Sequence, residues 1–344
     1  MYYPLKFKPL YKDYIWGGRK FETLGKILPD GIAAESWEIS SHPDGTSIIA
    51  DGEHAGKKLD DLVREYGSEL LGTALYKSKD TKFPLLIKFI DANRDLSVQV
   101  HPDDKYAYNN ENGELGKNEM WYVVDAVPGS KLVLGVKEGI TKKIFKKAIE
   151  DGNVSDCLHS VEIKAGDCYN IPAGLIHAIG AGSLICEIQQ NSNTTYRVYD
   201  YDRTDAQGNK RPLHIEKALD VIDFEIGEGK NTCGLTPNVE DFSRTYLVAN
   251  EYFAVELMKF NGIVNENTDG ERFHCYTVLA GEIEINGTVT ERGHSCLVPA
   301  SAGNYIISGN AQVIKSYVPD IEKNIISPLL SEGFTKEQID SVTS

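Results

Sequence analysis

The chain has 344 residues, of which 41% are hydrophobic and 25% are charged. This is the composition of a globular protein, and the length is sufficient for two domains. The formal net charge of −15 at pH 7 disfavours nucleic acid or an anionic membrane surface as the main partner, and an anionic small molecule would require a local basic pocket.

The first ten residues, MYYPLKFKPL, contain no long apolar run and no small-residue cleavage site, so we expect no signal peptide. No stretch approaches the roughly 20 apolar residues that span a bilayer. The six cysteines are scattered and form no Cys-x-x-Cys pair, which predicts reduced thiols, several of them buried. These features predict a cytoplasmic protein without membrane attachment.

The first two thirds of the chain contain few helical patterns and many short alternating runs. Apolar residues spaced three and four apart predict helices over 56–72, 141–152 and 212–224. Strands are predicted over 82–92, 96–102, 119–127, 130–136, 167–172, 183–190 and 195–202. This density of strands favours an antiparallel sandwich or barrel over a parallel sheet with crossover helices.

The strand predicted over 96–102 has an unusual polar face. If it is extended, its apolar residues point to one side, and Ser97, Gln99 and His101 point to the other. This row of polar residues is either solvated or lines a site. The Pro102-Asp103 pair that follows looks like the start of a helix or a turn.

Four side chains in this part of the chain could bind a divalent metal. The spacing Gly-x5-Pro-x-Gly-x2-His, formed by Gly166, Pro172, Gly174 and His177, is typical of cupins and predicts His177 as a ligand. Imidazole nitrogens and carboxylate oxygens suit such a metal. Taken alone, each other candidate has an ordinary surface explanation, and His177 strengthens the case for Gln99, His101 and Glu119.

A second group of charged residues surrounds these candidates in the sequence. Glu187 and Arg197 lie on neighbouring predicted strands, where a simple salt bridge is the alternative explanation. Lys88 interrupts an apolar strand, which is costly unless it lines a pocket or has a partner. Lys88, Lys117, Arg197 and Arg203 together could form the local basic patch that the acidic chain otherwise lacks.

The composition changes after about residue 226, where a polar segment containing glycine and proline precedes an almost continuous series of strands and turns. We therefore predict domains over 1–230 and 231–344. Asn286-Gly287 predicts a type I′ hairpin, and a short helix is expected near Thr335. The segment 293–307 repeats the Gly-x5-Pro spacing of 166–180, but it has Ser301 and Asn304 in place of Gly174 and His177.

Six longer motifs occur together along the chain, namely YIWGG (14–18), ESWEISSHPDG (35–45), PLLIKFIDANRDLSVQVHPDD (84–104), GELGKNEMWYVV (113–124), IPAGLIHAIG (171–180) and NSNTTYRVYDYDR (191–203). Through these motifs the chain resembles the type I mannose-6-phosphate isomerases in their short bacterial form. The resemblance implies a mainly β fold of two cupin (jelly-roll) barrels with a few short helices. The second barrel is expected to be metal-free.

The resemblance also implies an activity and a site. The enzyme interconverts mannose 6-phosphate and fructose 6-phosphate through an enediol, with a phosphorylated hexose as substrate and one zinc ion per chain. The implied zinc ligands are Gln99, His101, Glu119 and His177. Arg197, Glu187 and Lys117 match catalytic positions, and Ser97, Lys88 and Arg203 match positions that contact the substrate or its phosphate. Lys117 is also a candidate for contact with the phosphate. We assign proton transfer to Glu187, with a zinc-bound hydroxide and Lys117 as the alternative bases. We assign electrostatic stabilisation to Arg197, because a guanidinium does not readily act as a base.

Two other functions are compatible with a metal-binding cupin. The first is a metal oxidoreductase, whose usual ligands are histidines with one carboxylate around a redox-active iron or copper. The second is a sugar-binding protein without catalysis. A glutamine ligand and a group of lysines and arginines fit the oxidoreductase poorly, and a binding protein would not require Glu187 or Arg197.

Overall fold

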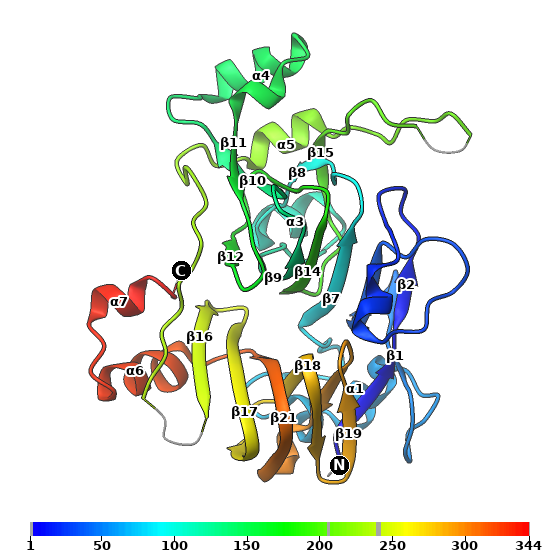
Figure 1. Cartoon of the computed structure of the whole chain (residues 1–344), viewed down its shortest axis with the longest axis vertical. Coiled ribbons are helices and arrows are strands. Elements are labelled where there is room, and N and C mark those ends of the chain that lie inside the picture. The colour runs from blue at the N-terminus through cyan, green and yellow to red at the C-terminus, as the bar shows by residue number, and fades with distance from the viewer. Residues whose placement is uncertain (1–2, 205–206, 239–241, 344) are drawn as a thin grey trace.

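The computed structural model describes residues 3–204, 207–238 and 242–343. Strands dominate the structure, and they form two units that lie one above the other in Figure 1. The predicted class, mainly β with a few short helices, is confirmed. None of the helices in this described part of the chain has the length and hydrophobicity of a membrane span.

The first unit consists of two antiparallel sheets with a shared apolar core. One sheet has the order β11-β10-β13-β8-β15, and the other has the order β12-β9-β14-β7-β3-β2. Apolar side chains from both sheets pack between them, including Leu132, Ile179, Trp121 and Ile185. The strands are β2 (Leu10–Lys12), β3 (Glu35–Ile39), β7 (Leu85–Ala92), β8 (Val98–Val100), β9 (Glu119–Ala126), β10 (Lys131–Val136), β11 (Leu158–Glu162), β12 (Cys168–Ile171), β13 (His177–Ile179), β14 (Ser183–Gln190) and β15 (Tyr196–Tyr199).

Three helices accompany the first unit near β8 and β15. The helices predicted over 141–152 and 212–224 are confirmed as α4 (Lys142–Glu150) and α5 (Ile215–Val221). α3 (Asp104–Asn110) begins where the Pro102-Asp103 pair suggested a helix or turn start, and the carboxylate of Asp103 caps it by accepting from the Tyr106 N–H at 2.7 Å. Apolar residues of these helices pack with Val98 and Val100 of β8 in one cluster.

The helix predicted over 56–72 is interrupted. It forms α1 (Leu59–Tyr66) and α2 (Ser68–Leu71), which are separated by Gly67. Gly67 has a φ of +49°, and a Cβ at this position would lie 2.7 Å from the ring of Tyr76. The apolar spacing continues across Gly67, but the backbone turns there because glycine tolerates this conformation and the ring occupies the space beside it.

The second unit is built on an eight-stranded sheet with the order β16-β17-β21-β18-β20-β1-β6, in which β19 pairs with β18. The predicted hairpin is confirmed, since Asn286 and Gly287 both have positive φ between β18 and β19. The strands are β1 (Leu5–Lys8), β6 (Ile48–Ile49), β16 (Ser243–Ala249), β17 (Ala254–Asn267), β18 (His274–Ile285), β19 (Thr288–Glu291), β20 (Ser295–Val298) and β21 (Asn304–Tyr317).

The N-terminal strand connects the two units. β1 pairs antiparallel with β20, with Leu5 opposite Leu297, and it also pairs with β6. A strand from the start of the chain therefore completes a sheet whose other strands come mainly from beyond residue 243. The division at residues 230 and 231 stays a prediction, and this pairing crosses it.

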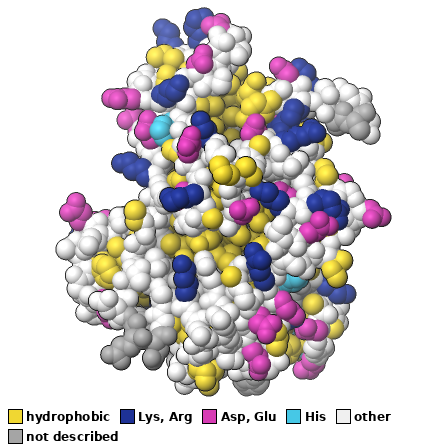
Figure 2. All heavy atoms as spheres, in the orientation of Figure 1, with side chains coloured by type: hydrophobic (Ala, Val, Ile, Leu, Met, Phe, Trp, Pro, Cys, Tyr) yellow, Lys and Arg dark blue, Asp and Glu magenta, His cyan; other side chains and the backbone are white. Residues whose placement is uncertain are grey.

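The units meet along an apolar interface. The rings of Phe83 and Phe273 lie 4.8 Å apart, and the side-chain amide of Gln312 donates to the Tyr122 hydroxyl at 2.9 Å. Figure 2 shows hydrophobic side chains gathered at the centre of the face where β9 and β12 approach β17 and β21, with lysines and arginines around them. This packing holds the strands that carry the site against a second core.

The remaining elements are short. The predicted C-terminal helix is confirmed as α7 (Lys336–Asp340), which Thr335 and Gln338 stabilise with a capping box. The six cysteines are free thiols, and five of them are buried. The other elements are β4 (Ser41–His42), β5 (Gly45–Thr46), the 3-10 helices Lys20–Leu24, Val154–Cys157 and Ala300–Ala302, the π-helix Glu322–Ile326 and α6 (Ser327–Ser331).

Candidate metal centre and pocket

One wall of the site is formed by three adjacent strands, β13, β8 and β15. His177 lies directly opposite Gln99, and Gln99 lies directly opposite Arg197. Residues opposite each other in antiparallel strands point to the same face, so these three side chains form a row across the sheet. The polar row predicted on 96–102 is thus on the inner side of the first unit, where Ser97 and His101 are buried.

The facing wall is formed by β9, β14 and β7. Glu187 lies opposite Lys88 on one side and Trp121 on the other, and Glu119 is two residues before Trp121. Register and alternation therefore bring two carboxylates and a lysine onto one buried face. The interruption of an apolar strand by Lys88 is explained by these partners.

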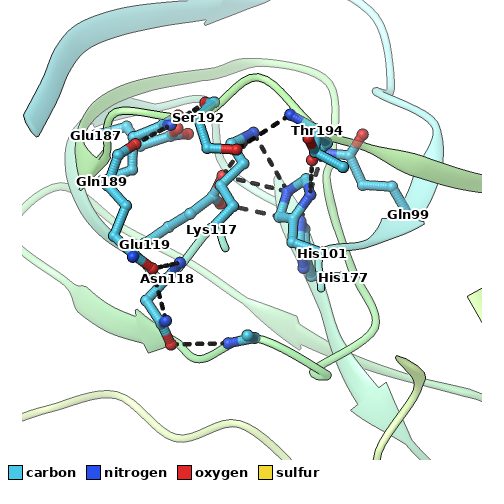
Figure 3. Close-up of polar contacts among 12 residues, drawn as sticks. Gln99, His101, Lys117, Asn118, Glu119, His177, Glu187, Gln189, Ser192 and Thr194 are labelled. Atoms are coloured by element: carbon cyan, nitrogen blue, oxygen red, sulfur yellow. Dashed lines mark hydrogen bonds and ion pairs between the residues drawn. The ribbon is translucent and has the colours of Figure 1, made fainter. Parts of the chain in front are cut away.

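His101, Glu119 and His177 converge between the two walls, as predicted (Figure 3). Their potential ligand atoms all lie within 4.8 Å of one another, and all three residues are buried. Nε2 of His101 is 3.2 Å from Oε1 of Glu119, and Nε2 of His177 is 3.9 Å from Oε2 of the same carboxylate. The two imidazoles thus face the two oxygens of one side chain.

The outward-facing nitrogen of each histidine is bonded to a backbone carbonyl. Nδ1 of His101 lies 2.8 Å from the carbonyl oxygen of Thr194, and Nδ1 of His177 lies 2.9 Å from that of Leu175. A carbonyl can only accept, so Nδ1 carries the proton and Nε2 presents its lone pair to the centre. Second-shell bonds of this kind orient metal-ligating histidines.

The pKa of His101 is lowered to about 3 by burial and then by the nearby charge of Lys117. Burial also lowers the pKa of His177. Both rings are therefore neutral at physiological pH, which is the form that binds a metal.

Gln99 and Lys117 lie at the edge of this group. The amide nitrogen of Gln99 is 3.4 Å from Nε2 of His177, and rotation of the amide presents its oxygen in the same place. The ammonium of Lys117 lies 3.0 Å from Oε1 of Glu119 and 3.4 Å from Nε2 of His101. Lys117 and Glu119 are therefore direct neighbours at the metal centre.

This donor set fits a borderline divalent metal. Two neutral imidazole nitrogens and one carboxylate form a three-ligand set that leaves positions open for a fourth ligand and a substrate oxygen. In the part of the chain that the structure describes, no second group of His, Cys, Asp and Glu side chains is arranged in this way. Asn304, which replaces His177 in the second copy of the motif, is exposed at the start of β21.

Glu187 lies beside the metal centre but belongs to a different set of contacts. Its Oε1 is 3.1 Å from Nζ of Lys88, which is also 3.7 Å from Glu35. The indole N–H of Trp121 donates to Oε2 of Glu187 at 3.0 Å and to Oε2 of Glu119 at 3.1 Å. One buried indole therefore fixes the distance between the two carboxylates.

Burial and the neighbouring Glu119 raise the pKa of Glu187 to about 7. For Lys88, burial alone would lower the pKa, but the carboxylates of Glu187 and Glu35 raise it above its ordinary value. Lys88 is therefore a permanent cation beside a carboxylate that accepts a proton near neutrality.

A pocket of about 260 Å³ opens onto this arrangement. Seven of the ten predicted site residues line it: Lys88, Ser97, Gln99, Lys117, Glu119, Glu187 and Arg197. His101 and His177 lie behind them. The pocket is also lined by residues that the sequence did not single out, namely Tyr14, Trp16, Glu35, Asn193, Thr195, Arg211 and His214.

Arg197 and Arg203 differ in their relation to the pocket. Arg197 donates from Nε to the Ser97 hydroxyl at 3.2 Å and from Nη1 to the carbonyl of Pro212 at 3.1 Å. Within the described residues, Arg203 is not part of the lining, and its donors go to Asp200 and to the backbone carbonyl of Asp95. Of the two, Arg197 is placed for direct contact with a ligand.

The sequence of this chain is similar to those of known mannose-6-phosphate isomerases. The family described as "Phosphomannose isomerase type I, catalytic domain" matches residues 5–123, and "Mannose-6-phosphate isomerase, cupin domain" matches residues 243–318. The mannose-6-phosphate isomerase ManA of Bacillus subtilis is 37% identical over 319 residues, which cover 92% of this chain and 99% of that protein.

Solved structures of mannose 6-phosphate isomerases are also similar to this chain. The crystal structure of the mannose 6-phosphate isomerase from Bacillus subtilis has a TM-score of 0.83 and 34% identity, covering 91% of this chain and 99% of that one. A mannose 6-phosphate isomerase bound with zinc and yttrium has a TM-score of 0.70 and 15% identity, covering 92% of this chain and 99% of that one. At this identity the second likeness concerns the fold.

Proposed function

The chain belongs to the type I mannose-6-phosphate isomerases, and from this membership we propose which of its residues bind the metal and perform the reaction. Its activity is the isomerisation of mannose 6-phosphate, so its substrate is a hexose phosphate. We infer that the metal is zinc and that Gln99, His101, Glu119 and His177 hold it. The cytoplasmic location stays a prediction from composition.

The observation that supports this assignment most strongly is the buried triad of His101, Glu119 and His177, with both histidines oriented through Nδ1. The zinc bound to a related isomerase agrees with the choice of metal. When bound, the ion supplies Lewis-acid polarisation of a substrate oxygen. Gln99 completes the set as a neutral fourth ligand.

Aldose–ketose isomerisation moves a proton between C2 and C1 of the open-chain sugar. Glu187 is the proposed base, because its carboxylate lines the pocket beside the metal ligands and is oriented by Trp121. It takes the proton from one carbon and returns it to the other, through an enediol. Lys88 holds the carboxylate in place from 3.1 Å.

The enediol oxygens develop negative charge that must be balanced. Arg197 is a permanent cation and a poor base, so it is suited to this stabilisation. Lys117, whose ammonium lies 3.0 Å from Oε1 of Glu119, is a second cation in the pocket that can approach these oxygens. We assign both residues to charge stabilisation.

Substrate binding is assigned to Ser97 and Lys88, whose polar groups face the pocket. The hydroxyl of Ser97 is also the acceptor that positions Arg197. The contacts of Arg203 with Asp200 and Asp95 favour a role for its charge rather than direct contact with the sugar.

The activity is tested by coupling fructose 6-phosphate formation to a dehydrogenase. The purified chain with zinc is expected to convert mannose 6-phosphate to fructose 6-phosphate without consuming oxygen. Bound iron or copper with oxygen consumption would instead support the oxidoreductase alternative. Sugar phosphate binding without any conversion would support the non-catalytic one.

A further inference from the structure

Three arginines gather where β15 ends and the chain continues toward α5. Arg197 and Arg211 line the pocket, and Arg203 lies between them in sequence. Asp200 is the carboxylate with which two of them form ion pairs, through Nη2 of Arg203 and Nη2 of Arg211. Arg197 forms no ion pair with any residue that the structure describes. Three guanidinium charges around one carboxylate leave an excess of two positive charges.

The bonds of Asp200 give the two arginines different roles. Arg211 donates from Nε to Oδ2 at 2.8 Å and from Nη2 to Oδ1, so it forms a bidentate ion pair with Asp200. Arg203 uses Nε and Nη2 on Asp200 and Nη1 on the carbonyl of Asp95. In the described part of the chain, Nη1 of Arg211 bonds to no other group, and it belongs to a residue that lines the pocket.

The most buried part of the pocket lining has a different charge pattern. Glu35, Glu119 and Glu187 lie there with Lys88 and Lys117, and these side chains are almost entirely buried. The three glutamates thus lie among the most buried lining residues, and Arg211, whose side chain is 26% exposed, belongs to the less buried part of the lining. An anionic group on the substrate is repelled from the first and attracted to the second.

Arg197 and Arg211 are close enough for the charge of one to affect the pKa of the other. Burial and then the charge of Arg211 lower the pKa of Arg197, while Asp200 opposes this effect. His214, which also lines the pocket, contacts the Arg197 backbone through Nδ1 at 3.2 Å. Three guanidinium groups that share one carboxylate are only partly neutralised, so an anion that binds between them is stabilised.

We propose that Arg211 is a phosphate-anchoring residue of this enzyme, positioned by Asp200 so that its free guanidinium edge binds the substrate phosphate, while Arg197 keeps its proposed role at the enediol oxygens. Arg203 holds the carboxylate of Asp200 in position through its own ion pair. The excess of two charges matches a phosphate monoester, which carries about −1.5 to −2 at neutral pH. This inference rests on the proposed function, because it takes the hexose phosphate as the ligand.

The test compares Arg211→Gln, Arg211→Lys and the control Lys210→Gln in the full chain with zinc. Lys210 is the adjacent residue, and it pairs on the surface with Asp202, so the control removes the same charge outside the pocket. Arg211→Gln is expected to raise the KM for mannose 6-phosphate by about tenfold to a hundredfold, which corresponds to loss of a hydrogen bond to a charged group. The kcat is expected to change little.

Arg211→Lys is expected to recover part of this loss, and Lys210→Gln is expected to behave like the parent chain. Binding of inorganic phosphate, measured by calorimetry, should weaken in Arg211→Gln by a similar factor. An unchanged KM and unchanged phosphate affinity would overturn the proposal, as would a fall in kcat at constant KM. If the parent chain converts no substrate, the isomerase assignment fails, and phosphate calorimetry alone still decides whether Arg211 binds the anion.

Discussion

Glu187 is the residue on which the proposed chemistry depends most. Its surroundings are unusual for a carboxylate, since burial and Glu119 raise its pKa to about 7 while Lys88 and Trp121 fix its position. A carboxylate in such a place is costly to maintain for stability alone. The cost is understandable if the same group must accept and release a proton near neutral pH.

Replacing Glu187 with glutamine is therefore expected to remove proton transfer while keeping the size of the side chain. We expect kcat to fall by about 10² to 10⁴, the usual contribution of a general base. Exchange of the C2 hydrogen with solvent, followed by NMR in deuterated water, should fall by the same factor.

The matched control is Glu162→Gln on β11, whose side chain is 74% exposed and which should keep full activity. Zinc content should be equal in both variants, since Glu187 is not a proposed ligand. If Glu187→Gln retained full exchange at C2, Glu187 would not be the base.

Some residues of the candidate site could be predicted from the sequence, and others could not. His177 was predictable from a spacing motif and His101 from the polar face of its strand, whereas Glu119 was predicted by association with His177 and by the family resemblance; the structure brings all three together. Glu35 and Arg211 were missed because neither has a local signal. Glu35 reaches the site through strand β3, and Arg211 through the return of the chain after β15, and only the tertiary arrangement places them in the pocket.

Among the elements, the turn between β12 and β13 controls the position of His177. Gly174 has a φ of +88°, and its N–H donates to the carbonyl oxygen of His101 at 2.9 Å. A Cβ at this position would lie 3.1 Å from Cβ of Asp223 and 3.2 Å from the carbonyl oxygen of Val221. The turn thus links the two histidine segments, and a Cβ at Gly174 requires its neighbours to move by a few tenths of an ångström.

Gly174→Ala is expected to weaken zinc binding, because the turn must shift to relieve both the backbone strain and the contacts with the segment after α5. The control is Gly166→Ala in the same motif, which has a φ of +93° but nothing within 4 Å of the added Cβ. Both variants should lose stability of about 1 kcal/mol from the left-handed backbone.

Only Gly174→Ala should also raise the dissociation constant for zinc, measured by competition with a chelator. Equal zinc affinities in the two variants would show that the turn does not position His177.

Local patterns predicted elements well where the determining forces are local. The hairpin at Asn286-Gly287 and the capped helix after Thr335 are set by the residues within them. The break at Gly67 and the pairing of β1 with β20 were not predictable in this way. The first depends on the ring of Tyr76, and the second joins residues almost 300 positions apart.

At the scale of the whole molecule, both units contain buried charged side chains, but these have different partners in the two units. The first unit gathers charges around a pocket and a metal centre. The second buries Glu266 between Lys315, at 2.7 Å, and Arg244, whose guanidinium also lies 3.5 Å from Glu256. Burial alone would raise the pKa of Glu266, but these two cations lower it below its ordinary value.

A carboxylate with a lowered folded-state pKa stabilises the protein above its unfolded pKa, and this contribution is lost as the pH falls through the folded value. Glu266→Gln is therefore expected to cost about 3 to 5 kcal/mol at neutral pH, because it leaves buried cations without a partner. The difference from the parent chain should shrink as the pH falls below 4.5, the ordinary value for glutamate.

The measurement is the free energy of unfolding in urea across this pH range. Glu284→Gln, at an exposed position of β18, is the control and should follow the parent chain throughout. A gap between Glu266→Gln and the parent that stays constant below pH 4.5 would contradict the role assigned to this ion pair.

The negative net charge of the molecule contrasts with the charged residues that line the pocket. A chain with a net charge of −15 does not attract phosphates in general, yet lysines and arginines supply four charges to a pocket that contains three carboxylates. When Glu119 is engaged by a metal, the remaining charge favours an anionic substrate. Selectivity for a sugar phosphate thus depends on a local arrangement within an acidic surface.

The central claim is that one zinc ion, held by His101, Glu119 and His177 with Gln99, supports isomerisation. The most direct test is to strip the metal with a chelator and to titrate zinc back while following fructose 6-phosphate formation. We predict no activity without metal and a linear rise that saturates at one zinc per chain. Full activity in the stripped protein, or saturation only at two zinc ions per chain, would contradict the account.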